Sequence, residues 1–440
     1  MSKYTCVLID TLSIQNYVFA SNKLKENIGA SFLVESIYKH SHVKTKPLQD
    51  PQGYIGGGNA LLFFENEANA KEFATEWTTV LLVEYPGIKT SITIGEIEFD
   101  NDDDIKFKVG KDKLFEQLAV NKNKYHPQVN LPSHGLTGDC PRTGFSMEDW
   151  LYIYDEDKKI IPYESGYVSS ISKAKIEAAK KAEENLHHDS DYDSIFKDGF
   201  KFTDELEKLG SSRGEDSHLA IVHIDGNNMG QRFELCDSLK KTVDLSKSLE
   251  KATKTSYLDL LLFIIENYNI IRDETSLEDK ILPIRLIILG GDDITFVCDG
   301  RLGIYFAEKF LKIFEEKEVS DGNKLTACAG VAITKLKFPF SRGYQLAEEL
   351  CRNAKMQKEK IADNGSWIDF HISFGGFTGS LEDIRKTYIA PQGNLLMRPY
   401  KIIDDDSIYS FGSLVKNTKH FFKKDKETGK PKFPNSKIKE

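Results

Sequence analysis

The sequence predicts an α+β protein in which two ferredoxin-like units face each other, with a small insertion between them. Two stretches of the chain repeat the order strand–helix–strand–strand–helix–strand. In each stretch an apolar strand ends in an aspartate, Asp10 or Asp225, and a glycine-rich turn joins the next two strands. The repeat therefore predicts two copies of one fold, packed so that their glycine turns border a cleft.

The first copy is expected in residues 1–127. Its elements, in chain order, are a strand at 4–9, a helix at 13–38, a hairpin at 54–64, a helix at 66–84, a strand at 89–97 and a last helix that carries Phe115, Leu118 and Lys122. Residues 216–400 hold the second copy. Its elements are a strand at 218–224, helices to about 270, a hairpin at 284–298, a helix at 302–317, a strand at 324–334 and a helix at 342–359. That last helix carries Lys355, where the first copy offers Lys122 or Lys124.

The insertion, residues 128–215, differs in character from both copies. Its apolar runs predict a short hairpin from 151–154 and 160–163, followed by a helix at 171–186. His187-His188-Asp189 at a polar helix end lacks partners at ligand spacing and is expected to be solvated surface. Residues 401–440 form a tail, dense in lysine from Lys416 on, that is expected to be solvated and partly disordered.

The composition argues against several classes of protein. A net charge of −9 argues against broad nonspecific binding of nucleic acid. The six cysteines form no C-x-x-C pair, so neither a zinc finger nor a disulfide framework is expected, and the thiols should be buried and reduced. No apolar stretch is long enough to span a membrane, and the opening residues lead into a strand instead of a signal peptide. These features predict a cytoplasmic protein with no membrane partner.

The second hairpin carries Gly-Gly-Asp-Asp at 290–293 between two apolar runs. If its strands neighbour the strand that ends in Asp225, then Asp225, Asp292 and Asp293 meet at one end of a sheet. Carboxylates this close raise each other's pKa unless a divalent cation neutralises them. Gly-Gly-Asp-Asp alone is also a good solvated turn, but the second element, Asp225-Gly226-Asn227-Asn228-Met229-Gly230, favours a metal site for phosphoryl transfer.

The two copies differ at this turn. Aligning the hairpins by their glycines places Gly57-Gly58-Asn59-Ala60 opposite Gly290-Gly291-Asp292-Asp293. An amide and a methyl group cannot supply the charge that a metal needs. The second copy is therefore expected to be catalytic, and the first to retain the fold alone.

With these motifs in the stated order, the chain resembles the large polymerase–cyclase subunit of type III CRISPR effector complexes. That family is related to GGDEF diguanylate cyclases and to polymerase palm domains. The similar segments are 225–230 for its first acidic motif, 22–31 for the helix after its first strand, and 327–332 with 347–355 for the downstream strand and helix. The resemblance covers about residues 1–127 and 216–400, and implies a degenerate palm followed by a catalytic one.

The chain also departs from the family. It begins at the first palm strand, so we expect no HD nuclease domain. The zinc-binding cysteines between the palms are missing apart from Cys140, and little room follows residue 400 for the family's helical C-terminal domain. The resemblance therefore implies a minimal or stand-alone member, with association with type III effector subunits and guide or target RNA left open.

Together the residues and the resemblance predict a nucleotidyltransferase that condenses nucleoside triphosphates, ATP above all, into a cyclic oligoadenylate with release of pyrophosphate. Two Mg²⁺ or Mn²⁺ ions would be held by Asp225, Asp292, Asp293 and the carbonyl of Ile224. The expected nucleotide contacts are Gly226, Asn227, Asn228, Met229, Gly290, Gly291 and Lys355 in the second copy, with Ser31, Gly57, Gly58 and Asn59 in the first holding the acceptor nucleotide. A homodimer is compatible with this scheme, but is not required for the first bond.

Two other functions stay open at this stage. A templated or template-free polymerase would use the same carboxylates and yield linear products. A non-catalytic double-palm scaffold would only assemble with protein or RNA partners, and the presence of all three carboxylates in one copy disfavours it.

Overall fold

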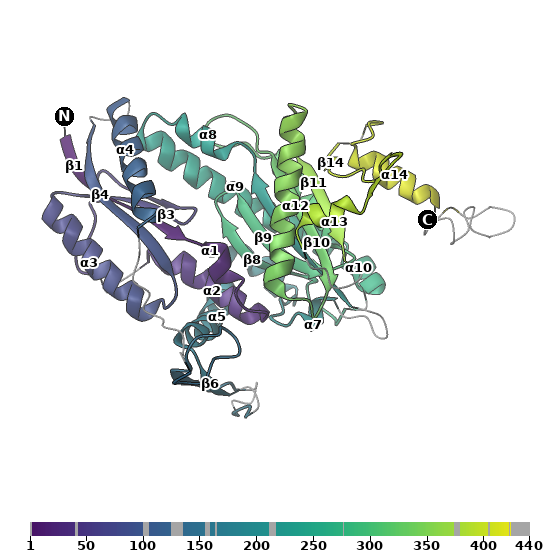
Figure 1. Cartoon of the computed structure of the whole chain (residues 1–440), viewed down its shortest axis with the longest axis horizontal. Coiled ribbons are helices and arrows are strands. Elements are labelled where there is room, and N and C mark those ends of the chain that lie inside the picture. The colour runs from purple at the N-terminus through teal and green to yellow at the C-terminus, as the bar shows by residue number, and fades with distance from the viewer. Residues whose placement is uncertain are drawn as a thin grey trace.

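The computed structural model describes residues 2–39, 43–99, 105–124, 135–154, 159–162, 165–210, 217–275, 277–373, 379–403, 405–421 and 423. Its strands form a four-stranded sheet, a six-stranded sheet and two two-stranded sheets. The four-stranded sheet with its helices, here called the first unit, lies at one end of the molecule, and the six-stranded sheet with its helices, the second unit, occupies the rest (Figure 1). No helix within these ranges is long and apolar enough to cross a membrane.

The first unit has the predicted ferredoxin-like order. Its strands are β1 (Ser2–Leu12), β2 (Tyr54–Gly56), β3 (Asn59–Phe64) and β4 (Lys89–Phe99), arranged β2-β3-β1-β4 with antiparallel neighbours. Helices α2 (Leu24–Ser36) and α3 (Glu67–Glu84) pack on one face of the sheet, and α4 (Ile105–Lys122) packs on the other.

The helix-compatible segment at 13–38 is helical as expected, but it is interrupted. The structure has two helices, α1 (Ile14–Val18) and α2, because Phe19 leaves the helical path and Lys23 is extended. Phe19 instead stacks on Tyr344 of the second unit, with ring centroids 3.8 Å apart. This tertiary contact overrides local helix propensity.

The second unit repeats the same order and extends it. Strands β7 (His218–Gly226), β8 (Ile284–Gly290), β9 (Asp293–Asp299) and β10 (Ala327–Lys335) lie in the order β10-β7-β9-β8. Two further strands follow β10 at the edge, β11 (Trp367–Ile372), which is parallel to it, and β14 (Tyr400–Lys401). The predicted α+β fold of two ferredoxin-like units is thus confirmed, and the second sheet is larger than expected.

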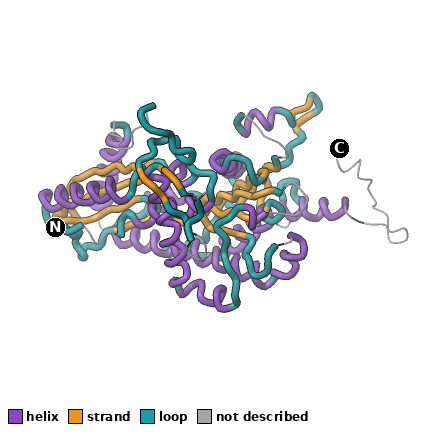
Figure 2. The backbone as a smooth tube through the Cα atoms, turned by 90° about the horizontal axis from the view of Figure 1, so that it is seen from below, coloured by secondary structure: helices purple, strands orange, loops and turns teal. Residues whose placement is uncertain are grey.

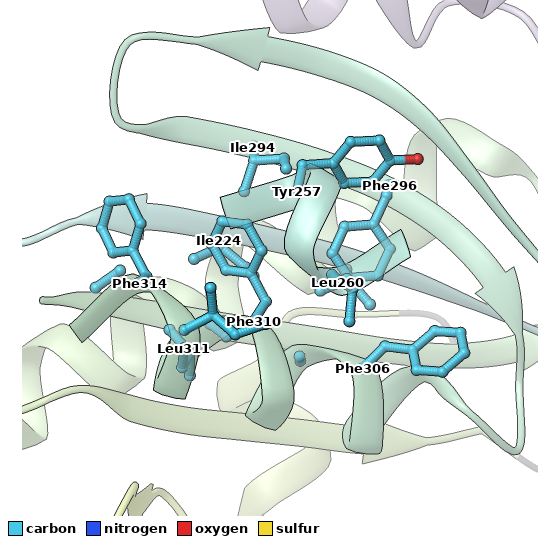
Figure 3. Close-up of a cluster of buried hydrophobic side chains, with 14 of the residues drawn as sticks. Ile224, Tyr257, Leu260, Ile294, Phe296, Phe306, Phe310, Leu311 and Phe314 are labelled. Carbon is cyan, nitrogen blue, oxygen red and sulfur yellow. The ribbon is translucent and has the colours of Figure 1, made fainter. Parts of the chain in front are cut away.

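Alternation along β7 decides which residues reach the functional face. Ala220, Val222 and Ile224 enter a large apolar core with α9 (Leu239–Glu266) and α11 (Gly303–Glu315), part of which Figure 3 shows. Burial of a side chain the size of Val222 or Ile224 contributes roughly 1.5–3 kcal/mol. Since neighbouring residues of a strand point to opposite faces, His223 and Asp225 lie on the other face, beneath α12 (Phe340–Lys360).

Helix α9 joins the tips of the two glycine hairpins. A Cβ placed on Gly56 would lie 2.7 Å from Ser246 Oγ of α9. Seven residues further along this helix, Thr253 Oγ1 donates a hydrogen bond of 2.6 Å to the carbonyl of Gly291. At 1.5 Å per residue, the two hairpin tips contact α9 about 10 Å apart. Helix α9 therefore runs past both hairpin tips.

The insertion packs against the first unit through α5 (Ser170–His188). Its hairpin pairs β5 (Asp149–Leu151) with β6 (Gly166–Val168). The predicted strands 151–154 and 160–163 meet in a bridge between Tyr154 and Ile160 and in a hydrogen bond from Ile161 N to the carbonyl of Ile153. Among the insertion's histidines, His187 lies 3.6 Å from Glu183 and packs on Phe196. The remaining helices of this region are η1 (Ser190–Tyr192), α6 (Asp193–Lys197) and α7 (Glu207–Gly210).

The C-terminal region is ordered further than expected. After α13 (Leu381–Lys386), a small hairpin of β12 (Ile389–Ala390) and β13 (Gly393–Asn394) stands out from the body (Figure 2). Strand β14 and helix α14 (Phe411–Phe421) then follow, and Phe411 is buried in the core of the second unit, so this unit continues past residue 400. Most of the lysine-rich tail, 424–440, lies outside the described residues. All six cysteines are free and buried, as expected.

Candidate active site

An open cavity of about 310 Å³ lies where β7 ends, beneath α12 and beside the tip of the β8–β9 hairpin. It brings together seven of the predicted residues, Asp225, Gly226, Asn227, Asn228, Met229, Asp292 and Lys355. Four more residues line it that were not among the predicted contacts, Gly230, Gln231, Lys358 and Glu359. Asp293, Gly290, Gly291 and Ile224 lie immediately around the cavity in the same strands and turn.

The hairpin tip is a two-residue turn. Gly290 pairs with Asp293, so Gly291 and Asp292 form the turn itself. Gly291 has φ +63°, a conformation that favours glycine at the first turn position, and Thr253 binds its carbonyl. The turn therefore presents the Asp292 carboxylate at the end of the sheet.

Gly226 lets the end of β7 touch this turn. A Cβ on Gly226 would lie 2.6 Å from Asp292 Cβ, a separation that real Cβ atoms do not show. Asn227 then turns inward, since its backbone N–H and side-chain amide donate to Thr326. Asn228, with φ +59°, starts the short helix α8 (Met229–Glu234). The predicted phosphate-binding segment is thus in place, but the Asn227 side chain has a structural role.

The electrostatics of the cavity are dominated by Asp225 and Asp292. Burial and the charge of Asp225 raise the pKa of Asp292 to about 7. Lys355 Nζ lies 2.7 Å from Asp225 Oδ2 and donates to the carbonyl of Gly226 at 2.8 Å. Lys358, on the next turn of α12, is only 4% exposed, and its ammonium group makes no hydrogen bond or ion pair among the described residues. The cavity thus combines a carboxylate pair with two lysines, one of them unpaired.

Asp293 points away from the cavity floor toward His223. Its Oδ1 lies 3.3 Å from His223 Nδ1, and this buried oxygen has no hydrogen-bond partner among the described residues. Burial lowers the pKa of His223, but the contact with Asp293 and the charges of Asp293, Asp225 and Glu348 together outweigh burial, so that the net shift of this pKa is upward. In the antiparallel pairing of β7 with β9, Ile224 lies opposite Ile294. The next position toward the hairpin tip is Asp225 on β7 and Asp293 on β9, so the two aspartates lie opposite each other.

The chemistry of these side chains suits a divalent cation, but their arrangement does not yet form a cation site. Asp225, Asp292 and Asp293 supply the carboxylate oxygens that Mg²⁺ and Mn²⁺ prefer. Burial and the charge of Asp225 raise the pKa of Asp292, and a cation beside this carboxylate would counter both effects. Within the described ranges, however, no three His, Cys, Asp or Glu side chains already form a metal-ligand cluster. The ion pair of Lys355 with Asp225 and the orientation of Asp293 toward His223 account for this.

The first unit shows where the hairpin alignment was wrong. In this unit Gly56 pairs with Asn59, so Gly57 and Gly58 form the turn, and Asn59 lies opposite Asp10. Asn59 is therefore the counterpart of Asp293, and Gly58 is the counterpart of Asp292. The alignment by glycines was shifted by one residue, since it placed Asn59 opposite Asp292. The turn of this copy still offers no carboxylate, since Gly58 has no side chain and Asn59 is an amide.

The structure also shows which lysine of the first unit corresponds to Lys355. Lys122 Nζ lies 2.6 Å from Asp10 Oδ2, as Lys355 does from Asp225, whereas Lys124 binds Asn121. The lysine–aspartate pair is therefore a feature of both copies.

The predicted acceptor residues of the first unit lie outside the cavity. Ser31 lies on α2, and the carbonyl of Gly58 accepts hydrogen bonds from Thr11 N and Tyr38 Oη. Gly57, with φ +59°, has open space around the position of a Cβ. Among these four residues, Gly57 is thus the one with open space beside it that a ligand could occupy.

The shifted pKa of Asp292 predicts a pH dependence of stability. The unfolded carboxyl titrates near 3.8 and the folded one near 7, so the folded state binds this proton more tightly. Its contribution is present below pH 4 and is lost as the pH rises through 7. We therefore expect Asp292→Asn to melt higher than the parent at pH 8 without divalent cations, and to match it at pH 4.5. Equal melting temperatures at pH 8 would contradict the assignment.

Comparison with known proteins agrees with this geometry. Residues 218–362, from β7 through α12, match the family model of the second palm domain of Cas10/Cmr2. No curated protein sequence matches the chain significantly.

The fold of the chain is similar to that of solved Csm1–Csm4 structures. The apo cassette matches with a TM-score of 0.53 and 16% identity, over 95% of this chain and 61% of that chain. The cassette in complex with pppApA matches with 0.52 and 13%, over 95% and 62%. The cassette with one ATP matches with 0.50 and 16%, over 81% and 53%. The chain thus spans less than two thirds of the chains it matches, and it has a Cas10-like double-palm architecture, as its sequence predicted.

Proposed function

We propose that the chain is a divalent-metal-dependent nucleotidyltransferase that condenses ATP into cyclic oligoadenylate in type III CRISPR defence. The observation that carries this proposal is the cavity in which Asp225 and Asp292 meet Lys355 and Lys358. It lies inside the region that matches the second palm domain of Cas10/Cmr2. Csm1–Csm4 cassettes of the same fold have been solved with ATP, with pppApA and with cA3, which supports a chemistry of this class.

In this proposal Asp225, Asp292 and Asp293 hold the cations, with the Ile224 carbonyl beside them. Bound Mg²⁺ or Mn²⁺ would lower the pKa of the attacking ribose hydroxyl and stabilise the charge on the α-phosphate and the leaving pyrophosphate. Asp292 then stays ionised at neutral pH, because a cation beside it reverses the effect of burial and of Asp225. Lys355 keeps Asp225 and the end of β7 in place through its bonds to both.

Lys358 is the side chain best placed to bind phosphate. Its ammonium group faces the cavity without a partner among the described residues, and it is nine-tenths buried, so an anion there gains a charge-assisted contact in a water-poor setting. The backbone of Gly226 to Met229 lines the same cavity. The triphosphate would therefore lie between the start of α8 and Lys358.

The first unit would present the acceptor nucleotide. Its Gly57 turn and the Gly-Gly-Asp-Asp turn both contact α9, and the acceptor turn has no carboxylate of its own. By the likeness to Csm1–Csm4 cassettes, we also propose that the chain docks with an effector subunit of the Csm4 class.

The test is mass spectrometry of products after incubation with all four nucleoside triphosphates and Mg²⁺ or Mn²⁺. Cyclic oligoadenylate, resistant to phosphatase, is the expected product. Linear chains that lengthen with time would instead indicate a polymerase. No product, and no ATP-dependent thermal stabilisation with Mg²⁺, would leave the scaffold function.

The role of Lys358 gives a separate prediction. Lys358→Met should raise the KM for ATP about tenfold with little change in kcat, because one charge-assisted phosphate contact is lost. Lys360→Met, an exposed position two residues along α12, is the control and should keep the parent KM. A parent-like KM in Lys358→Met would place the triphosphate elsewhere.

A further inference from the structure

A buried polar pair lies directly behind Asp293. His223 on β7 and Thr295 on β9 are cross-strand partners, 4% and 0% exposed. His223 Nδ1 lies 3.1 Å from Thr295 Oγ1 and 3.3 Å from Asp293 Oδ1. The ring of Tyr344 packs edge-on against the imidazole, with centroids 5.5 Å apart, and fixes its plane.

Such a pair is not needed to build the fold. Burying an imidazole and a hydroxyl in a sheet core costs free energy unless their hydrogen bonds are made. The first unit makes the same cross-strand pair from Leu8 and Leu61, both fully buried. The two pairs occupy equivalent positions. Leu8 precedes Asp10 by two residues on β1, just as His223 precedes Asp225 by two residues on β7.

The polar pair thus occurs in the unit whose hairpin carries carboxylates, and leucines take its place in the unit whose hairpin has lost them. A structural requirement of the shared fold would apply to both units alike. The difference follows the chemistry of the hairpin instead, and the single group of that hairpin within reach of the pair is the Asp293 carboxylate.

We propose that His223 and Thr295 are positioning residues that hold the Asp293 carboxylate for a divalent cation. The imidazole restrains Oδ1 from behind, Thr295 anchors the imidazole, and the second carboxylate oxygen of Asp293 is kept toward the Asp225 side of the sheet end. Groups that orient a metal-binding carboxylate typically account for about 10–100-fold in metal affinity or activity. The inference rests on the proposed function, since it assumes that Asp293 binds a cation.

The test replaces the pair by the one that the first unit already uses. In the double variant His223→Leu/Thr295→Leu the sheet keeps an apolar cross-strand pair of proven fit, so we expect it to fold. Calorimetric titration with Mn²⁺ in the presence of AMPPNP should show an affinity reduced about 10–100-fold. Nucleotidyl transfer should fall by a similar factor at limiting Mn²⁺ and recover in part at saturating Mn²⁺.

Two single variants separate positioning from packing. His223→Asn keeps an amide N–H near the place of Nδ1 and should retain Mn²⁺ affinity within about threefold, whereas His223→Leu should not. Thr334→Val, a buried threonine of β10 away from the hairpin, is the control for loss of a hydroxyl in this sheet.

Three outcomes would overturn the inference. Parent-like Mn²⁺ affinity in the double leucine variant is the first. Equal defects in His223→Asn and His223→Leu are the second, since they would indicate a packing role. Absence of Mn²⁺ binding by the parent itself is the third. If the parent makes no nucleotide product yet binds Mn²⁺, the proposed function fails, and the affinity ratios still decide the role of the pair.

Discussion

Asp292→Asn should lower nucleotidyl transfer by at least about 10³-fold, equivalent to roughly 4 kcal/mol of transition-state stabilisation, while the protein stays folded. Asparagine has the shape of aspartate, so the two-residue turn and its contact with Gly226 are kept. What is lost is the charge at the point where a cation would sit. The measurement is the rate of pyrophosphate release from ATP at saturating Mg²⁺, with the melting temperature as evidence of folding.

The first unit supplies the matched control. Asp10 lies near the end of β1 and pairs with Lys122, as Asp225 lies near the end of β7 and pairs with Lys355. Asp10→Asn removes a partly exposed ion pair of modest energy, and activity should stay within about tenfold of the parent. Pyrophosphate release at an undiminished rate in Asp292→Asn, or equal losses in both variants, would mean that the second unit is not the catalytic one.

Much of the fold could be predicted because its signals are local. The strand ending in Asp225, the glycine hairpin and the helix that carries Lys355 each rest on periodicity within about twenty residues. Strand β11 could also have been found, because Ile368, Phe370 and Ile372 alternate with polar residues. The break at Phe19 and the edge strand β14 could not be predicted this way. The helix breaks at Phe19 because this ring stacks on Tyr344, which is far away in the sequence. Strand β14 has only two residues, which is too short for a periodic pattern.

The errors within the site have equally physical causes. Three consecutive glycines, Gly56 to Gly58, allow two hairpin registers, and the ladder between Asp10 and Asn59 selects the one not chosen. Lys358 could have been found, because residues three apart on a helix share a face with Lys355. His223 could also have been found, since strand alternation places it on the face of Asp225. Its contact with Asp293 depends on the β7–β9 register, which sequence spacing does not give.

The Gly57 turn gives the second large prediction, that one chain contains a complete site. Gly57→Trp should reduce activity about 100-fold, because the position is open and its hairpin contacts α9, the helix that also contacts the Gly-Gly-Asp-Asp turn. Gly58 is the wrong position for this experiment, since a Cβ there would lie 2.6 Å from Ile14 Cδ1 and disturb the unit itself. Gly57→Asn is the control, because asparagine tolerates the left-handed conformation and adds little bulk.

Mixing the two defects decides where the site forms. Asp292→Asn spoils the second unit and Gly57→Trp the first, so each chain retains one sound half. If sites form within a chain, the mixture stays as inactive as its parts. If they form between chains of a dimer, half of the dimers are mixed and each regains one of its two sites, so about a quarter of the parent activity returns. We expect no recovery, because α9 of one chain already contacts both hairpin tips, through Ser246 and Thr253. A partner subunit would have to displace the chain's own first unit, whose Phe19 and α2 are packed into the core beneath α12.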